Sequence, residues 1–147
     1  LLLAFDRPVD LEFEGAFVEE SALSWLAVDS SKPGRSGEAS LVLHGSPSWS
    51  DDNFEADGEC VVQDLCRAFT EATGARLDVP VYSRLHRWRY ALPTEPLADR
   101  YLFDAGSRVG VCGDWCAGPR VEGAYLSGVA LAERLVQCFV DGEPRDA

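Results

Sequence analysis

The chain has 147 residues, the length of about one domain, and its 46% hydrophobic and 26% charged residues are typical of a globular protein rather than a disordered one. Its 25 Asp and Glu outnumber its 13 Lys and Arg, and the formal net charge of -12 repels phosphate backbones and anionic lipid at long range. We therefore predict no nucleic-acid partner. A dinucleotide cofactor is not excluded, because the amides at a helix N-terminus bind phosphate locally whatever the net charge.

No apolar stretch of the sequence is long enough to cross a bilayer, and no basic region precedes the apolar residues 1–5. We therefore expect neither a signal peptide nor a membrane partner. Five cysteines without C-x-x-C pairs favour a reduced, cytoplasmic setting. A metal site would have to use Cys112, Cys116, His44 or His86, but their spacing lacks the ligand pairs of zinc sites, and we predict none.

The first half of the chain is predicted to form antiparallel strands joined by short loops. Apolar and β-branched runs, separated by polar, Gly and Pro residues, predict strands at 1–5, 15–19, 25–29 and 39–44. The loop from Lys32 to Gly37 is not a phosphate-binding loop, because Pro33 follows the lysine where Ser or Thr is needed. We interpret it as a tight turn; contact of its basic residues with a bound anion is the alternative.

Helical periodicity replaces alternation after residue 58. The spacing predicts a helix over 59–73 that ends before Gly74, a residue favoured just after a helix C-terminus. Its core face comprises Val61, Leu65, Ala68, Phe69 and Ala72. We assign no chemistry to this helix.

The segment VYSRLHRWRYAL, between Pro80 and Pro93, predicts another strand. Alternation places one set of side chains on a common side: Tyr82, Arg84, His86, Trp88 and Tyr90. Such a strand either packs under helices with its polar tips satisfied or lines a cavity for a flat, charged ligand. His86 alone is better explained as a hydrogen-bonded core histidine than as a catalytic base.

The C-terminal third predicts two short strands, 101–103 and 108–112, and then a long helix with apolar residues at helical spacing from Val121 to Phe139, ending at Asp141-Gly142. The helix follows the stretch CGDWCAGPRVEGAYLSG. Gly113 and Gly118 permit close approach of a partner to the backbone, and Pro119 suits the opening turn of a helix.

The start of this helix is predicted to bind an electron-rich oxygen. Free N–H groups in the turn Val121 to Ala124 would point outward at the positive end of the helix dipole. Asp114 would accept hydrogen bonds from sugar or ribityl hydroxyls, whereas Glu122 is explained by the dipole alone. Gly123 and Gly128 each cost about 1 kcal/mol relative to Ala in a helix, which indicates close approach of a ligand or packing of the helix on a sheet.

A family resemblance rests on several separated segments in one order along nearly the whole chain. GVCGDWCAGPRVEGAYLSGVALAERL resembles the C-terminal flavin-contacting motif of FAD-dependent amine oxidase-like proteins, and HRWRYALP, SSKPGR and HGSPSWS resemble the renalase branch. The resemblance implies an α+β fold: an antiparallel or mixed sheet covered by helices (1–98), then strands and a helix of an FAD-binding domain (99–147). The activity implied is hydride transfer from an amine or a dihydronicotinamide isomer to flavin, and then to O₂.

The resemblance also implies the site residues. Those expected to contact FAD are Gly113, Asp114, Arg120, Val121, Glu122, Gly123 and Ala124. Those expected to enclose a small-molecule substrate are His86, Trp88, Arg89 and Tyr90.

One departure from the family pattern is large. The G-x-G-x-x-G that seats the ADP half of FAD does not occur in the sequence. We therefore expect these residues to be the C-terminal part of a longer flavoenzyme, with FAD held by the parent protein and not by this part alone. The alternative is a ligand-binding or structural module without FAD.

Overall fold

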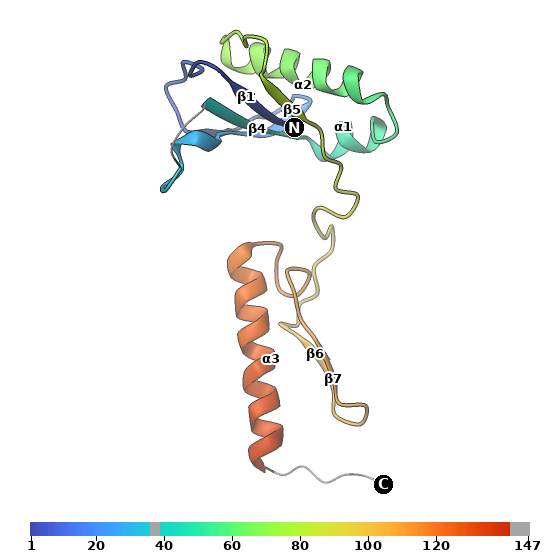
Figure 1. Cartoon of the computed structure of the whole chain (residues 1–147). Helices are drawn as coiled ribbons and strands as arrows, with labels where there is room; N and C mark the ends of the chain where they lie inside the picture. The colour runs from blue at the N-terminus through green and yellow to red at the C-terminus, as the bar shows by residue number, and fades with distance from the viewer. Residues whose placement is uncertain (36–38, 142–147) are drawn as a thin grey trace. The chain divides into compact units, whose positions relative to one another are not determined.

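The computed structural model describes residues 1–35 and 39–141, and the chain divides into two compact units, Leu1–Arg87 and Trp88–Ala147 (Figure 1). An antiparallel sheet and helices in the first unit, followed by a hairpin and a long helix, confirm the predicted α+β class. The assignment of functional domains to 1–98 and 99–147 stays a prediction.

The first unit is built on a five-stranded antiparallel sheet with the strand order β2-β3-β4-β1-β5. Its strands are β1 (Leu2–Phe5), β2 (Gly15–Phe17), β3 (Leu23–Val28), β4 (Ala39–Gly45) and β5 (Tyr82–Arg84). The four strands predicted in the first half of the chain are confirmed, with ends shifted by a few residues. A short 3-10 helix, η1 (Asp29–Ser31), which the sequence did not indicate, follows β3.

Helix α2 (Gly58–Thr73) confirms the predicted helix at 59–73. The Asp57 carboxylate caps its start by accepting hydrogen bonds from the amides of Glu59 and Cys60 at 2.9 and 3.3 Å. Gly74 ends it in the left-handed region with φ 73°, as its position predicted. The six-residue helix α1 (Pro47–Asp52) was not predicted, because it is too short to show a helical period.

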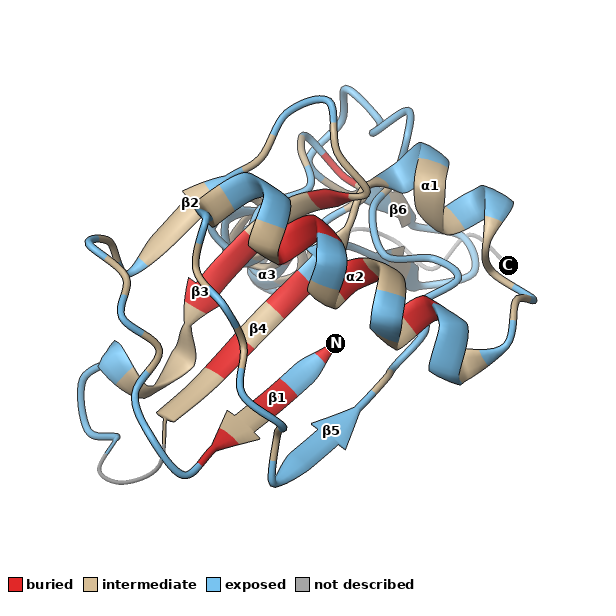
Figure 2. Ribbon diagram, turned by 90° about the horizontal axis from the view of Figure 1, so that it is seen from above, coloured by how far each residue is buried: buried red, intermediate tan, exposed pale blue. Residues whose placement is uncertain are grey.

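The core of the first unit lies between α2 and one face of the sheet, where the buried residues of Figure 2 gather. Leu3, Leu26 and Leu43 project from successive strands toward this side, and alternate sheet residues project to the other. Four of the five predicted core-face residues of α2 are buried. Ala72 is exposed, because it lies in the last turn of the helix.

The predicted long strand between Pro80 and Pro93 is wrong. β5 has three residues, Tyr82–Arg84, which pair with Leu2–Ala4 of β1. His86 and the residues after it leave the sheet, so they share no strand face. Trp88 and Tyr90 are 73% and 92% exposed, so neither side chain packs under a helix.

The second unit consists of a hairpin, β6 (Leu102–Asp104) and β7 (Val109–Val111), and the helix α3 (Val121–Asp141). Both strands and the helix were predicted; Gly142, at the predicted helix end, lies outside the described residues. Leu131 of α3 packs on Gly110 of β7, where a Cβ atom would lie 2.7 Å from a leucine methyl carbon. Glycine at position 110 therefore lets the helix approach the strand.

Candidate functional site

The turn between β7 and α3 contains the residues expected to contact FAD. Ala117 and Gly118 adopt positive φ values of 62° and 132°, and the Arg120 amide then donates to the Gly118 carbonyl at 2.9 Å. The Ala124 amide donates to the Arg120 carbonyl at 2.9 Å, which begins the hydrogen bonding of α3. The chain thus reverses sharply before the helix starts.

Gly123 is required by this reversal. A Cβ atom on Gly123 would overlap the carbonyl oxygen of Gly118, so the turn and the helix touch through backbone. The space beside Gly128, in contrast, is empty of described atoms within 4 Å. Of the two helix glycines in the sequence motif, only Gly128 is left without a packing explanation in the described part of the chain.

Gly113 is likewise explained by its own neighbourhood. A Cβ atom there would lie 2.6 Å from the indole nitrogen of Trp115, two residues further along the turn. The space beside Gly113, where close approach of a partner was predicted, is therefore occupied by the Trp115 side chain. Gly118 has open space around it, and its φ of 132° requires glycine.

Buried contacts hold the turn in place. Leu97 pairs with it on both sides: its amide donates to the Trp115 carbonyl at 2.8 Å, and its carbonyl accepts from the Ala117 amide at 2.7 Å. Between these bonds the Cys116 side chain is fully buried. The Ser127 hydroxyl of α3 accepts a hydrogen bond from the Gly113 amide at 3.0 Å. The sequence analysis missed Leu97, Cys116 as a packing residue, and Ser127, since a serine in a small-residue run gives no distinct signal.

The first amides of α3 have no acceptor in the described part of the chain. Among the described residues, no hydrogen bond engages the N–H groups of Val121, Glu122 or Gly123. Val121 is 90% exposed, so the start of the helix faces solvent. Three donors at the positive end of the dipole suit an anionic or carbonyl oxygen. The prediction of free amides also included Ala124, which is wrong because the Ala124 amide donates to the Arg120 carbonyl. Glu122 lies in this first turn, where its charge interacts favourably with the dipole.

Asp114 and Arg120 both precede these donors in the chain, and both side chains are exposed. The Asp114 carboxylate has no hydrogen bond or ion pair among the described residues, so it is available to accept from hydroxyl groups of a ligand. A flavin carries carbonyl oxygens on its ring and hydroxyl groups on its ribityl chain. The amides can donate hydrogen bonds to such carbonyl oxygens, and the carboxylate can accept hydrogen bonds from such hydroxyls. The residues present therefore fit this group.

The four residues expected to enclose a substrate do not lie on a common strand. His86 follows β5 in the first unit, whereas Trp88, Arg89 and Tyr90 open the second. All four are exposed. Their role therefore stays a prediction.

The face of the sheet opposite α2 is a second candidate surface, and the sequence analysis did not identify it. The strand register places Trp25 beside His44, and the Phe17 and Trp25 rings lie 4.6 Å apart. Partial burial is the main cause that lowers the pKa of His44, and the positive charge of Lys32 acts in the same direction, so the neutral form is favoured. The period of two in the strands could have indicated this face.

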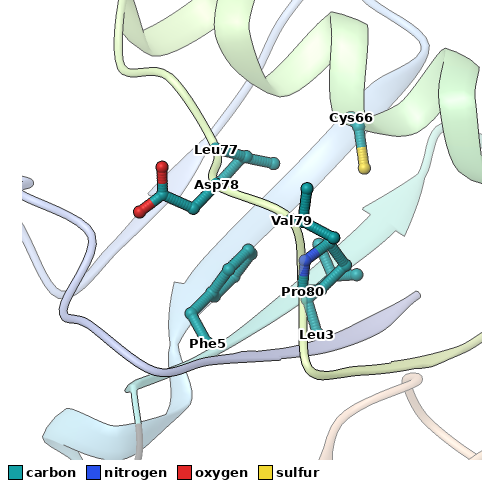
Figure 3. A pocket seen from close by; sticks show the side chains of 7 residues that line it. All are labelled: Leu3, Phe5, Cys66, Leu77, Asp78, Val79 and Pro80. Atoms are coloured by element: carbon teal, nitrogen blue, oxygen red, sulfur yellow. The ribbon is translucent and has the colours of Figure 1, made fainter.

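A cavity of about 280 Å³ lies in the first unit between β1, α2 and the segment after α2 (Figure 3). Its walls are apolar apart from Asp78 and the Cys66 thiol, and they comprise Leu3, Phe5, Cys66, Leu77, Asp78, Val79 and Pro80. Burial raises the pKa of Cys66, so its thiol is protonated and behaves as a small apolar group. No hydrogen-bonding array in these walls points to a ligand.

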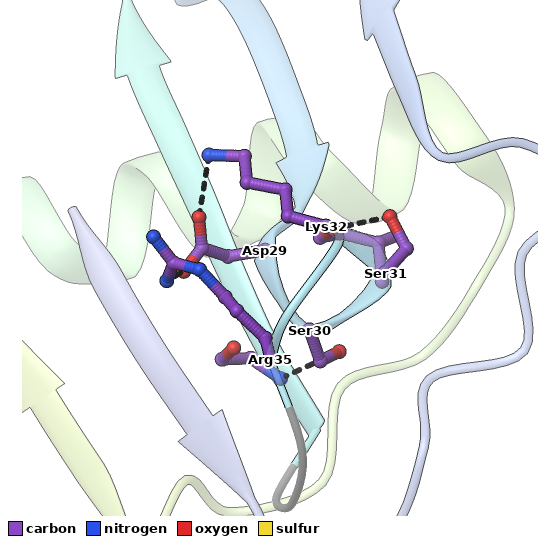
Figure 4. Close-up of polar contacts among 7 residues, drawn as sticks. Asp29, Ser30, Ser31, Lys32 and Arg35 are labelled. Atoms are coloured by element: carbon purple, nitrogen blue, oxygen red, sulfur yellow. Dashed lines mark hydrogen bonds and ion pairs between the residues drawn. The ribbon is translucent and has the colours of Figure 1, made fainter.

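The basic residues of the loop after η1 are already paired (Figure 4). Asp29 accepts from Lys32 at 2.6 Å and also from the Arg35 guanidinium. The pairing favours the interpretation as a tight turn over contact with a bound anion. Ser36 and Gly37, at the end of the predicted loop, lie outside the described residues.

The described residues contain neither a metal-binding cluster nor a membrane-spanning helix. Within 1–35 and 39–141, no three His, Cys, Asp or Glu side chains are grouped so that they could hold a metal ion. No helix described there is long and apolar enough to span a membrane.

The described residues form an α+β chain in which a hairpin precedes a long helix, and the first three amides of that helix and the Asp114 carboxylate have no partner among those residues. Residues 1–136 match the family model of the flavin-containing amine oxidoreductases. The chain belongs to this family, which confirms the resemblance to flavin-dependent amine oxidases.

Proposed function

We propose that this chain forms part of an FAD-dependent oxidoreductase of the renalase-like branch. On this proposal a reduced nitrogen-containing substrate, an amine or a dihydronicotinamide isomer, would give up a hydride to FAD bound in the full-length protein, and O₂ would reoxidise the cofactor, taking up two electrons and two protons as hydrogen peroxide. The family match over residues 1–136 supports the flavin and the reaction class. The single observation in the fold that carries the proposal is the start of α3, where three amides and Asp114 are left without partners among the described residues.

Bound flavin supplies the redox chemistry, and the protein supplies placement and electrostatics. The amides of Val121, Glu122 and Gly123 stabilise negative charge on a ring carbonyl oxygen, because they are fixed before the charge develops. Asp114 accepts a hydrogen bond from a ribityl hydroxyl, and Arg120 contacts an anionic group.

On the substrate side, the proposed contacts are His86, Trp88, Arg89 and Tyr90. Two of them carry aromatic rings suited to a flat substrate, and Arg89 suits an anionic one.

The ADP half of FAD needs a separate binding element. These 147 residues contain no G-x-G-x-x-G, so we propose that another part of the full-length protein seats the ADP half. On this proposal residues 1–147 alone retain no FAD and stay colourless after incubation with it. A stoichiometric yellow complex would contradict this part of the proposal.

The test of the flavin site is Asp114→Ala in the full-length protein. Loss of one hydrogen bond to a charged group is expected to weaken FAD binding about 10-fold or more. FAD affinity is measured by quenching of flavin fluorescence, and Glu133→Ala, an exposed carboxylate further along α3, is the control. Unchanged affinity in a folded Asp114 variant would refute the proposed contact. A wild-type protein that binds no FAD would instead favour the module without flavin.

A further inference from the structure

Ser127 is the buried polar side chain among the described residues, with 1% of its surface exposed. Its hydroxyl accepts a hydrogen bond from the Gly113 amide at 3.0 Å and donates one to the Arg100 carbonyl at 2.5 Å. One side chain of α3 thus joins the segment that leaves β7 to the segment that enters β6. The bonds span 14 and 27 residues of sequence.

The chemistry of both bonds requires a hydroxyl. One group must accept from an N–H and donate to a carbonyl, which among small side chains a serine or threonine hydroxyl does. Alanine would fill almost the same space but would leave a partly buried N–H and C=O without partners. A serine buried only for packing would not need this pairing.

The bonded amide belongs to the residue before Asp114. The Gly113 amide lies in the peptide between Cys112 and Gly113, so its bond to Ser127 anchors the chain just before Asp114. The next peptide is held within the turn, because the Gly113 carbonyl accepts from the Cys116 amide at 3.1 Å, and the Asp114 carboxylate has no partner among the described residues. The other end of the turn is held through the bonds of Leu97 to Trp115 and Ala117. Loss of the Ser127 bonds would therefore release the anchor of the chain before Asp114 and leave the backbone bonds of the turn in place.

We propose that Ser127 is a positioning residue of the flavin site: its paired hydrogen bonds hold the Gly113 peptide so that Asp114 meets the ribityl hydroxyls of FAD. The inference rests on the proposed function. Ser127 acts through Asp114 and makes no contact with the flavin itself.

The decisive experiment is a double-mutant cycle on FAD affinity in the full-length protein, with Ser127→Ala, Asp114→Ala and the pair. We expect Ser127→Ala to weaken FAD binding about 10-fold in the wild-type background and less than 2-fold when Asp114 is already Ala. Ser127→Thr, which keeps the hydroxyl, should restore most of the affinity. Equal losses in both backgrounds would show a general structural role and overturn the proposal.

A second measurement does not depend on flavin. In residues 1–147, amide hydrogen exchange of Gly113 should speed up at least 10-fold in Ser127→Ala, with exchange at Ala117 changed less. Thr70→Ala, which removes a hydroxyl bonded to the Cys66 carbonyl in α2, is the control and should leave Gly113 unaffected. Unchanged Gly113 exchange in Ser127→Ala would overturn the positioning role even if FAD bound normally. Absence of FAD binding by the wild type would overturn the proposed function, and with it the flavin role of Ser127.

Discussion

The two longer helices begin in opposite ways. At the start of α2, Asp57 accepts hydrogen bonds from two amides of the first turn, so the helix satisfies its own donors. At the start of α3, the first three amides have no acceptor among the described residues, although Asp114 and Glu122 lie close in sequence. The first arrangement stabilises the helix and occupies these two donors. The second leaves binding capacity for something outside the described residues.

The same contrast extends to the interiors of the two units. The first encloses a continuous apolar cluster between α2 and the sheet. In the second, the buried side chains among the described residues are Cys116, Ser127 and Leu131, and α3 exposes a set of large apolar side chains. That set comprises Val121, Tyr125, Leu126, Val136, Phe139 and Val140. A helix that is apolar on more than one face is typical of one buried from several sides, so the second unit has apolar surface left for further burial.

The largest effect on stability is expected from a comparison of two phenylalanines, one in each unit. Phe69 of α2 is fully buried, and Phe69→Ala should reduce the free energy of unfolding by about 3–5 kcal/mol through lost burial and a cavity. Phe139 of α3 is 84% exposed, and Phe139→Ala should change the free energy of unfolding by less than about 0.5 kcal/mol. Urea unfolding followed by circular dichroism measures both. A cost above about 1 kcal/mol for Phe139→Ala would mean that α3 is buried in the isolated chain.

A second test separates the two glycines of α3. Gly123→Ala forces a Cβ atom against the Gly118 carbonyl and should destabilise the second unit by about 1–3 kcal/mol. Gly128→Ala meets no described atom and should stabilise the helix by up to about 1 kcal/mol, because alanine is the better helix former. Amide hydrogen exchange along α3 reports both changes. Destabilisation by Gly128→Ala would show that another surface packs on that position.

The smallest expected effect tests the helix starts themselves. Asp57→Ala should cost about 1 kcal/mol, since it removes the cap of α2, and Asp57→Asn should recover most of that loss. Asp114→Ala should leave the free energy of unfolding unchanged within about 0.5 kcal/mol, because Asp114 caps no described amide. The readout is the urea midpoint of residues 1–147. Equal costs at both positions would remove the distinction between the two helix starts.

The sequence predicted the elements that have a clear period or a clear end signal. The apolar face and the terminal Gly74 predicted α2, and apolar and β-branched runs between polar, Gly and Pro residues predicted the strands of the first half. The long strand after Pro80 was wrong, because pairing with a neighbouring strand decides where a strand ends, and of this segment only Tyr82–Arg84 pairs with β1. No local pattern could reveal that.

The candidate site was predicted in part, for a similar reason. Local rules indicated the open start of α3 and the free carboxylate of Asp114. They explained Gly113 by close approach of a partner and Gly123 by a ligand or by packing on a sheet, whereas Trp115 and the Gly118 carbonyl lie beside these two positions. The support from Ser127 and Leu97 comes from residues far along the chain, and no spacing rule connects them.

The contact of Gly123 with Gly118 changes how a glycine in this motif should be weighed when sequences are compared. A relative could lose every function of the turn and still need glycine at position 123, because the requirement arises inside the chain. Retention of that glycine therefore carries little information about cofactor use. Position 128 is the informative one: a relative that replaces Gly128 by a larger residue while keeping Gly123 has kept the turn and changed what approaches the helix.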